Sequence, residues 1–407
     1  MTVPNEILFF ALLLFSGLVL AAVFQRFHVP SSLWYLLVGF LAALWISSSG
    51  YDLGLRWFNF RFIAFYMILP ALVFTAALEL DVRALMRHLI SILILSIPVF
   101  LIMLLISAAL LYDGIDSSEG FPWAAAFLTA TILSATDPEE ILHFCEKFGA
   151  PQRLILLIKG ESLFNDAGSI LIYGLVMNFA LGSKSSWHLS DALSHFLLLF
   201  FGGILTGLAG GLILWLFFRL VKGQSERLLL ILITVYAGFI LSETVFNVSG
   251  VMTLLTLGII SNLLYDSKAE SSEKDTLFHL WSFLAHLAHA LVMILVGISI
   301  VPAMFTERWL AMLIGIIAVM AARAIGIYGV FPLFNFFAVR EKLNKADKHI
   351  LFWGSNRGAI AVALALSLPL SLDYWFTIQS ITYGVVLFGL LIQLGLTPHF
   401  LRRLFKA

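Results

Sequence analysis

Charged residues are scarce in this chain, at 12% of its 407 residues, whereas roughly a quarter of the residues in a soluble domain carry charge. Apolar residues make up 61%, which excludes an ordinary soluble fold. Cysteine is nearly absent, and the single Cys145 cannot form an intrachain disulfide. The residues before the first apolar run lack the basic segment of a signal peptide, so this run is expected to remain as a helix. A net charge of zero argues against nucleic-acid binding.

The chain instead has a succession of apolar runs of transmembrane length, since a helix needs about 20 apolar residues to span a bilayer. We predict an all-α polytopic membrane protein with thirteen transmembrane helices and no soluble domain. The predicted spans are residues 6–25, 33–49, 60–80, 89–112, 121–146, 152–181, 193–220, 226–244, 249–265, 276–301, 308–338, 347–369 and 375–397. In the seventh span Gly203, Gly207 and Gly211 form a stripe of small residues that predicts close helix packing.

The basic residues predict the orientation of the chain in the membrane. With thirteen spans and the N-terminus outside, most Lys and Arg residues fall in cytoplasmic segments, and only Arg56, Arg61, Lys184 and Arg308 lie outside. The positive-inside rule therefore places the C-terminus in the cytoplasm. An even number of spans would remove this asymmetry. We expect an integral protein of the cell (inner) membrane.

Three basic residues lie well inside apolar runs, namely Lys159, Arg323 and Arg357, and all other Lys and Arg residues lie between the runs or at their ends. A charged side chain in hydrocarbon is costly and usually functional. These three residues, and the acids near them, therefore indicate where the function lies.

The fifth span is interrupted by the segment Thr136-Asp137-Pro138-Glu139-Glu140. The proline lacks a backbone donor, so a regular helix cannot continue through it undisturbed. Freed backbone groups at membrane depth are tolerated only where they line a cavity or find polar partners. The break is therefore predicted to be part of a binding site. The alternative is a plain proline kink in which Thr136 bonds back to its own helix.

The sixth span has a polar face made of Glu161, Ser162, Asn165 and Asp166, because their spacings of three to five residues place them on one side of a helix. Asp166 lies roughly 20 Å from the cytoplasmic end of this span, close to the middle of the bilayer. An acid at that depth is a functional candidate. The alternative is a structural acid that pairs with a buried base.

The twelfth span is interrupted as well, by the glycine-containing segment from Trp353 to Gly358, which includes Arg357. Spans five and twelve correspond when the chain is divided into a first repeat (1–181), a connecting helix (193–220) and a second repeat (226–397). Paired interrupted helices at equivalent positions indicate a secondary transporter built from two inverted six-helix repeats, with its site near the midplane.

At these positions the chain resembles the monovalent cation:proton antiporters of the Asn-Asp branch, the NhaP-like electroneutral sodium/proton exchangers. The resemblance covers nearly the whole membrane region. It rests on four ordered segments, which are Thr136-Asp137-Pro138, Gly160 to Asp166, Ala322-Arg323-Ala324-Ile325-Gly326, and Trp353 to Gly358 continuing into Ala359-Ile360-Ala361.

The resemblance implies a dimerisation domain and a six-helix core domain in which spans five and twelve unwind and cross. It implies that Asp166 binds a cation and a proton in turn, that Thr136, Asp137 and Ser162 contribute oxygen contacts, and that Asn165 holds the crossing together. Because the electrogenic branch has a second aspartate where this chain has Asn165, the resemblance also implies electroneutral exchange of one cation per proton. A homodimer is implied as well.

The same resemblance gives structural roles to the remaining charges. Glu161 would pair with Arg323 as an internal strut, and Arg357 would organise the break in the twelfth span. We therefore expect a transporter without a bound cofactor rather than an enzyme. Its substrates would be protons and Na⁺, with Li⁺ or K⁺ as alternatives.

The chain departs from the family pattern at two places. Thr75 follows Phe74 where the family commonly has a glutamate that contributes to the cation site, and two extra acids, Glu139 and Glu140, follow Thr-Asp-Pro. We hypothesise that one of these acids lies in the cytoplasmic funnel and partly replaces the missing glutamate, while Lys159 balances the other. The alternative is a solvated rim with no role in binding.

Two other functions remain open from the sequence. His286 and His289, which share a helix face with His279 in the tenth span, could serve a membrane-embedded metalloenzyme, sense pH, or simply be packed polar residues. A transporter of organic anions on the same scaffold would require a positively charged site and not a central Asp166.

Overall fold

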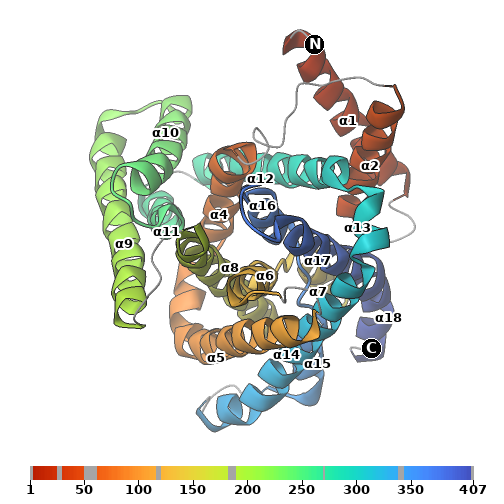
Figure 1. Ribbon diagram of the computed structural model, residues 1–407. Coiled ribbons are helices and arrows are strands. Elements are labelled where there is room, and N and C mark those ends of the chain that lie inside the picture. The colour runs from red at the N-terminus through yellow and green to blue at the C-terminus, as the bar shows by residue number, and fades with distance from the viewer. Residues whose placement is uncertain are drawn as a thin grey trace. The chain divides into compact units, whose positions relative to one another are not determined.

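The computed structural model describes residues 3–24, 30–49, 62–115, 121–181, 189–268, 271–337 and 343–404. Within these ranges the chain is helical apart from short connections and one isolated β-bridge. The first part of the chain forms α1 (Val3–Phe24), α2 (Ser31–Ser49), the π-helix η2 (Ile63–Ile68), α4 (Leu69–Leu78), α5 (Val82–Gly114), α6 (Trp123–Ser134), α7 (Glu139–Lys147) and α8 (Gln152–Leu181). The remainder forms α9 (Leu189–Leu220), α10 (Gln224–Thr244), α11 (Gly250–Lys268), α12 (Ser271–Ser299), α13 (Pro302–Glu307), α14 (Trp309–Phe337), α15 (Lys345–Trp353), α16 (Ala359–Leu366), α17 (Trp375–Phe388), the π-helix η3 (Gly389–Gln393) and α18 (Leu394–Leu404) (Figure 1).

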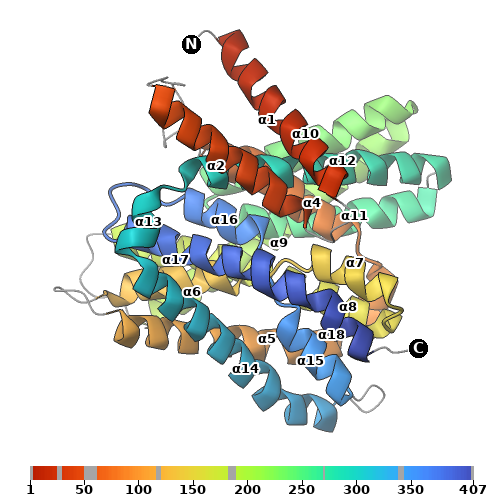
Figure 2. The same cartoon turned by 90° about the vertical axis from the view of Figure 1, so that its right-hand side faces the viewer.

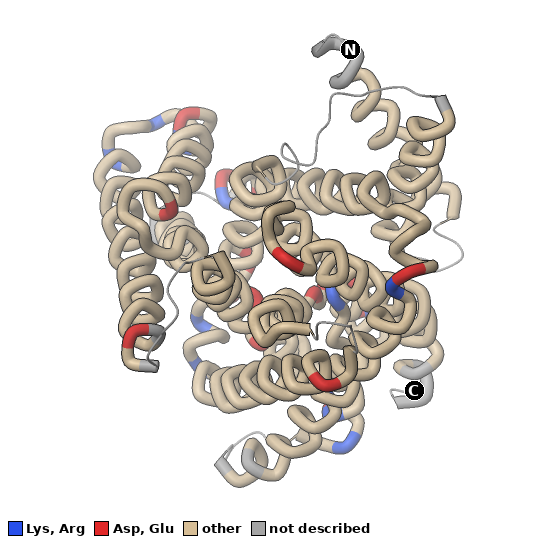
Figure 3. Tube along the Cα trace, viewed as in Figure 1, with Lys and Arg blue, Asp and Glu red and all other residues tan. Residues whose placement is uncertain are grey.

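Eight of the described helices are long and apolar enough to cross a membrane. Shorter apolar helices cover Leu8–Phe24, Ile63–Leu78, Trp123–Ser134 and Gly250–Tyr265. Each predicted span coincides with one helix or with two or three shorter helices, so the all-α membrane fold is confirmed. Figure 3 shows that charged positions are sparse along the helices, as the composition requires. The number thirteen and the division into inverted repeats stay predictions.

The described chain forms two compact units. The first unit comprises Met1–Ala64, His88–Ser169 and His289–Ala407, and the second comprises Phe65–Arg87 and Ile170–Ala288. In the first unit α17 packs against α14 and α6, and Figure 2 shows α14 and α17 running alongside each other. In the second unit α11 packs against α4, α9 and α10.

Close packing of α9 on α11 follows from the glycine stripe, as predicted. A methyl group added at Gly203 would lie 2.4 Å from the carbonyl oxygen of Ser249, and one added at Gly207 would lie 2.5 Å from Cβ of Thr256. The two helix backbones can approach this closely only because the stripe has no side chains.

Both predicted interruptions are present in the first unit. The fifth span is divided into α6 and α7 by an extended segment at Ala135, with Pro138 directly before α7. The twelfth span is divided into α15 and α16 between Gly354 and Gly358. The two gaps are joined by an isolated antiparallel bridge between Asp137 and Asn356. The two unwound segments thus pair with each other at the crossing expected from the resemblance.

Candidate functional site

Thr136, in the gap of the fifth span, is the residue on which the polar face of α8 converges. Its backbone N–H donates to Oδ1 of Asp166 at 3.1 Å, and its carbonyl accepts from Oγ of Ser162 at 2.6 Å. Its hydroxyl accepts from Nδ2 of Asn165 at 3.3 Å. Ser162, Asn165 and Asp166 lie on one face of α8, so all three can form hydrogen bonds with Thr136 at the same time. The alternative of a plain kink, with Thr136 bonded back to its own helix, is wrong.

Asp166 is half-buried at the centre of this arrangement. Among the described residues it forms no ion pair, and its hydrogen bond comes from a neutral donor, the backbone N–H of Thr136. The charged residue that acts on it most strongly is another acid, Asp137. The alternative of a structural acid locked to a buried base is therefore not what the structure shows.

Asp137 lies at the N-terminal ends of two half-helices, α7 and α16. Its Oδ1 accepts the backbone N–H of Glu139 at 3.1 Å, in the first turn of α7. Its Oδ2 lies against Gly358, directly before α16, where an added methyl group would be only 1.8 Å away. Because helix N-termini carry unsatisfied N–H groups and a partial positive charge, a carboxylate between two of them is stabilised. Its own N–H donates to the carbonyl of Asn356 at 2.8 Å and closes the crossing.

The two buried arginines satisfy the opposite ends of the half-helices. Nε of Arg357 donates to the carbonyl of Leu133 at 2.9 Å, in the last turn of α6, and Nη1 binds the carbonyl and hydroxyl of Ser355. Nη2 of Arg323 donates to the carbonyl of Leu351 at 2.7 Å, in the last turn of α15. Unpaired carbonyls at a helix C-terminus favour a cation. All four half-helix ends at the crossing therefore meet a group of the opposite sign.

Glu161 and Arg323 form an ion pair between α8 and α14, as the resemblance implies. Both side chains are almost completely buried. Asn165 lies beside the pair, with Nδ2 3.5 Å from Oε1 of Glu161. The polar face of α8 is thus connected both to the gap of span five and to α14.

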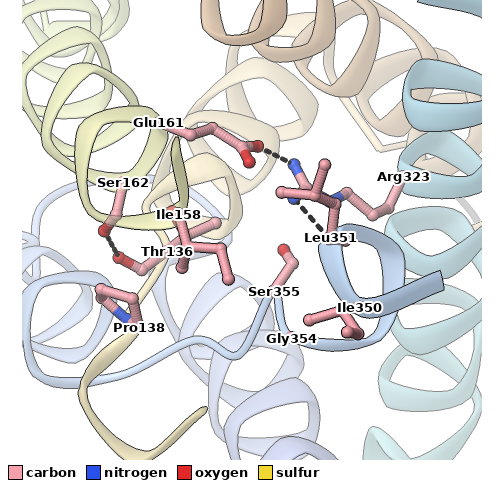
Figure 4. A pocket seen from close by; sticks show the side chains of 10 residues that line it. All are labelled: Thr136, Pro138, Ile158, Glu161, Ser162, Arg323, Ile350, Leu351, Gly354 and Ser355. Carbon is pink, nitrogen blue, oxygen red and sulfur yellow. Dashed lines mark hydrogen bonds and ion pairs between the residues drawn. The ribbon is translucent and has the colours of Figure 1, made fainter. Parts of the chain in front are cut away.

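A small pocket lies beside the crossing, and Figure 4 shows Glu161 pointing across it toward Arg323 while Ser162 points toward Thr136. The pocket is lined by Thr136, Pro138, Ile158, Glu161, Ser162, Arg323, Ile350, Leu351, Gly354 and Ser355. Asp166 and Asn165 are not among these lining residues. On the polar face of α8, the pocket therefore contacts Glu161 and Ser162 and not the two residues that follow them on this face.

Comparison with known families agrees with this geometry. Residues 10–403 match the family described as "Sodium/hydrogen exchanger, transmembrane". The chain belongs to this family. The sodium/hydrogen exchangers are transporters rather than enzymes, and the predicted resemblance is confirmed.

Two curated relatives of this exchanger chain are the Na(+)/H(+) antiporter ApNhaP of Aphanothece halophytica and the low-affinity Na(+)/H(+) antiporter NhaS1 of Synechocystis. The first is 31% identical over 334 residues, covering 81% of this chain and 62% of the relative. The second is 31% identical over 342 residues, covering 82% of this chain and 63% of the relative. The exchanger chain thus matches less than two thirds of each relative's length.

The fold is also similar to a solved structure, that of the sodium proton antiporter MjNhaP1 from Methanocaldococcus jannaschii. The TM-score is 0.83 at 18% sequence identity, with both chains covered completely. At this identity the similarity establishes the fold of the exchanger chain.

The two extra acids of this exchanger lie at the start of α7, where their neighbours differ from the prediction. Glu139 is exposed, and its carboxylate lies 4.0 Å from Nδ1 of His289 on α12. Glu140 lies near the backbone N–H of Ser31 at the start of α2. No ion pair joins Lys159 to either acid in the described part of the chain, so the predicted balancing role of Lys159 is not observed. A basic neighbour of Glu139 among the described residues is His289, which the sequence alone did not indicate.

In the described part of the chain, the histidines of α12 do not belong to a group of metal-binding side chains. Nε2 of His289 is hydrogen-bonded to Oγ of Ser32 at 2.9 Å. Across the described ranges, no three His, Cys, Asp or Glu side chains are grouped so that they could hold a metal ion. The metalloenzyme alternative therefore lacks a ligand set there.

Thr75, which occupies the place of the family glutamate, is buried in the second unit. Its hydroxyl donates to the carbonyl of Trp281 at 3.1 Å. The residue is therefore used for packing between α4 and α12.

Proposed function

We propose that this protein exchanges Na⁺ for H⁺ across a membrane by alternating access, with Asp166 as the group that holds either ion. Membership of the exchanger family and the antiporter names of its relatives support this proposal. The observation that carries it is the carboxylate of Asp166, which accepts a neutral backbone N–H at the helix crossing and has no basic partner among the described residues.

The charges at the crossing support exchange of one cation per proton. Glu161 and Arg323 cancel each other as an ion pair, and Asp137 and Arg357 carry opposite charges. Asp166 is then the acid without a counter-charge. A buried charge is costly unless it is paired. One proton or one monovalent cation on Asp166 restores neutrality, whereas both together would leave a positive charge.

The residues around Asp166 provide the ligands that a small hard cation requires. Such an ion leaves water only for several oxygen atoms, including a carboxylate. The hydroxyl of Ser162 donates its proton to the carbonyl of Thr136 and keeps its lone pairs, so it is able to contribute one ligand. Asp137 is within electrostatic reach and strengthens the attraction for a cation. Binding of the cation would replace the hydrogen bond from the Thr136 N–H to Asp166.

Three further features complete the proposal. The protein forms a homodimer in the cell membrane with its C-terminus in the cytoplasm. Glu139 or Glu140 attracts cations toward the site and partly replaces the acid absent at Thr75. Na⁺ is the main substrate because the relatives are named for it, and K⁺ and Li⁺ are the alternatives that the following experiment distinguishes.

The test uses purified protein in proteoliposomes that contain a pH-sensitive dye. A pulse of NaCl should change the internal pH, and Asp166→Asn should abolish the change because an amide cannot exchange a proton. Glu307→Gln, an exposed residue at the end of α13, is the matched control and should behave like the unmodified protein. Exchange that persists in Asp166→Asn would disprove the proposal.

The same assay decides the cation and the role of the extra acids. LiCl and KCl pulses rank the three ions. Glu139→Gln and Glu140→Gln, made separately, should weaken the apparent affinity for the cation in at least one case. Unchanged affinity in both variants would assign the two acids to the solvated rim.

A further inference from the structure

The π-helix η3 interrupts the last predicted span between α17 and α18. Here the N–H of Leu394 bonds to the carbonyl of Gly389, five residues earlier, instead of four. Such one-turn insertions are rare and often lie at functional sites. None of the residues assigned to the ion site lies in η3, so its presence requires another explanation.

The gap of the twelfth span contacts η3 at two points. Nε1 of Trp353, the last residue of α15, donates to the carbonyl of Gln393 at 3.0 Å. Oδ1 of Asn356 lies so close to Gly389 that an added methyl group would be 2.0 Å from it. Asn356, Gly389 and Gln393 are all buried. The wide turn therefore lies directly against the segment that forms the crossing.

Gln393 also connects η3 to α14. Its Nε2 lies 3.4 Å from the sulfur of Met320, which is three residues before Arg323 and on the same face of α14. The turn is thus held by the helix that carries the ion-pair partner of Glu161.

We propose that η3 is a positioning element for exchange, in which Gly389 lies against Asn356 and Gln393 holds Trp353, so that together they fix the twelfth-span gap and through it the ion site. The connection is short. The carbonyl of Asn356 accepts the N–H of Asp137, and the neighbouring N–H of Thr136 donates to Asp166. A displacement of Asn356 therefore moves the donor that Asp166 uses. This inference rests on the exchange activity proposed above.

The chain offers a matched pair of substitutions in the same span. In Gly389→Ala the new methyl group meets Oδ1 of Asn356, whereas in Gly395→Ala, six residues later, it meets nothing within 4 Å. Both changes replace a helical glycine by the best helix former. In the proteoliposome assay Gly389→Ala should raise the apparent KM for Na⁺ by about tenfold, because small misplacements of site groups have large effects. Gly395→Ala should leave the KM unchanged.

Two further measurements separate positioning from a general loss of folding. Asn356→Ala removes the oxygen that the methyl group meets, so the double variant Gly389→Ala/Asn356→Ala should recover the KM of Asn356→Ala alone. Hydrogen exchange of the Thr136 and Asp137 amides should be faster in Gly389→Ala, normal in Gly395→Ala and restored in the double variant. This second readout needs no transport, so it tests the inference even if the protein does not exchange Na⁺. Equal KM and equal amide exchange in the two glycine variants, or no recovery in the double variant, would overturn the inference.

Discussion

At the scale of single residues, all three polar groups of Thr136 are hydrogen-bonded, since its N–H, carbonyl and hydroxyl each bind a different side chain of α8. The sequence predicted this polar face and the break opposite it, because acids and a proline inside apolar runs are local signals that can be recognised without a structure. The neighbours of Glu139 could not be predicted in this way. Lys159 was expected to balance one of the two acids. The position of a residue along a helix does not determine which side of the helix faces a neighbour, and the basic side chain found beside Glu139 is that of His289.

The first prediction concerns the buried pair of Glu161 and Arg323. Glu161→Ala should destabilise the protein by about 3–5 kcal/mol, because it leaves the guanidinium of Arg323 buried without its counter-charge. Glu273→Ala removes the partner of Arg227 in a pair that is partly exposed, and should cost at most about 1 kcal/mol. Thermal unfolding in detergent compares the two variants. Equal shifts of the midpoint would contradict the assignment of Glu161 as a strut.

At the scale of elements, the two interrupted spans stabilise each other. Asp137 lies at the N-terminal ends of α7 and α16, while Arg357 and Arg323 bind the C-terminal carbonyls of α6 and α15. Both interruptions were predictable, since proline and glycine mark them in the sequence. The partners of the individual carbonyls were not, because each contact joins residues far apart in the chain and depends on how the helices are rotated.

The second prediction tests the contact between Asp137 and Gly358. A methyl group in Gly358→Ala would lie 1.8 Å from Oδ2 of Asp137, so the start of α16 must move away from the carboxylate. We expect exchange to be reduced by at least about tenfold. Gly329→Ala, where an added methyl group meets nothing within 4 Å, is the control and should retain activity. If the two variants transport equally well, the contact does not maintain the crossing.

At the scale of the whole molecule, composition and span order predicted an all-α membrane protein, and the structure and the family confirm it. The fold could be predicted from the apolar runs alone, whereas predicting the site required the charged residues, the proline and the glycines inside those runs. The pairing of η3 with the twelfth-span gap could not be predicted, since the residues around Gly389 are apolar apart from Gln393 and none of them marks a wide turn.

The third prediction concerns charge movement during a complete transport cycle. If one cation is exchanged for one proton, a membrane potential set by a potassium gradient and an ionophore should not change the Na⁺-driven pH difference at equilibrium. If one net charge moved per cycle, 100 mV would contribute about 2.3 kcal/mol and shift the ratio of ion concentrations at equilibrium by about 50-fold. Dye-loaded proteoliposomes at 0 and −100 mV distinguish the two outcomes. A dependence on voltage would exclude electroneutral exchange.

The bond between Arg357 and the carbonyl of Leu133 joins residues 224 positions apart. During synthesis the fifth span therefore enters the bilayer long before the arginine that completes it has been translated. Until then the end of α6 has a bare carbonyl in hydrocarbon, where no water replaces the missing donor. The newly inserted N-terminal half is consequently a metastable intermediate, and a ribosome that stalls before codon 357 would release a chain suited to degradation by membrane quality control.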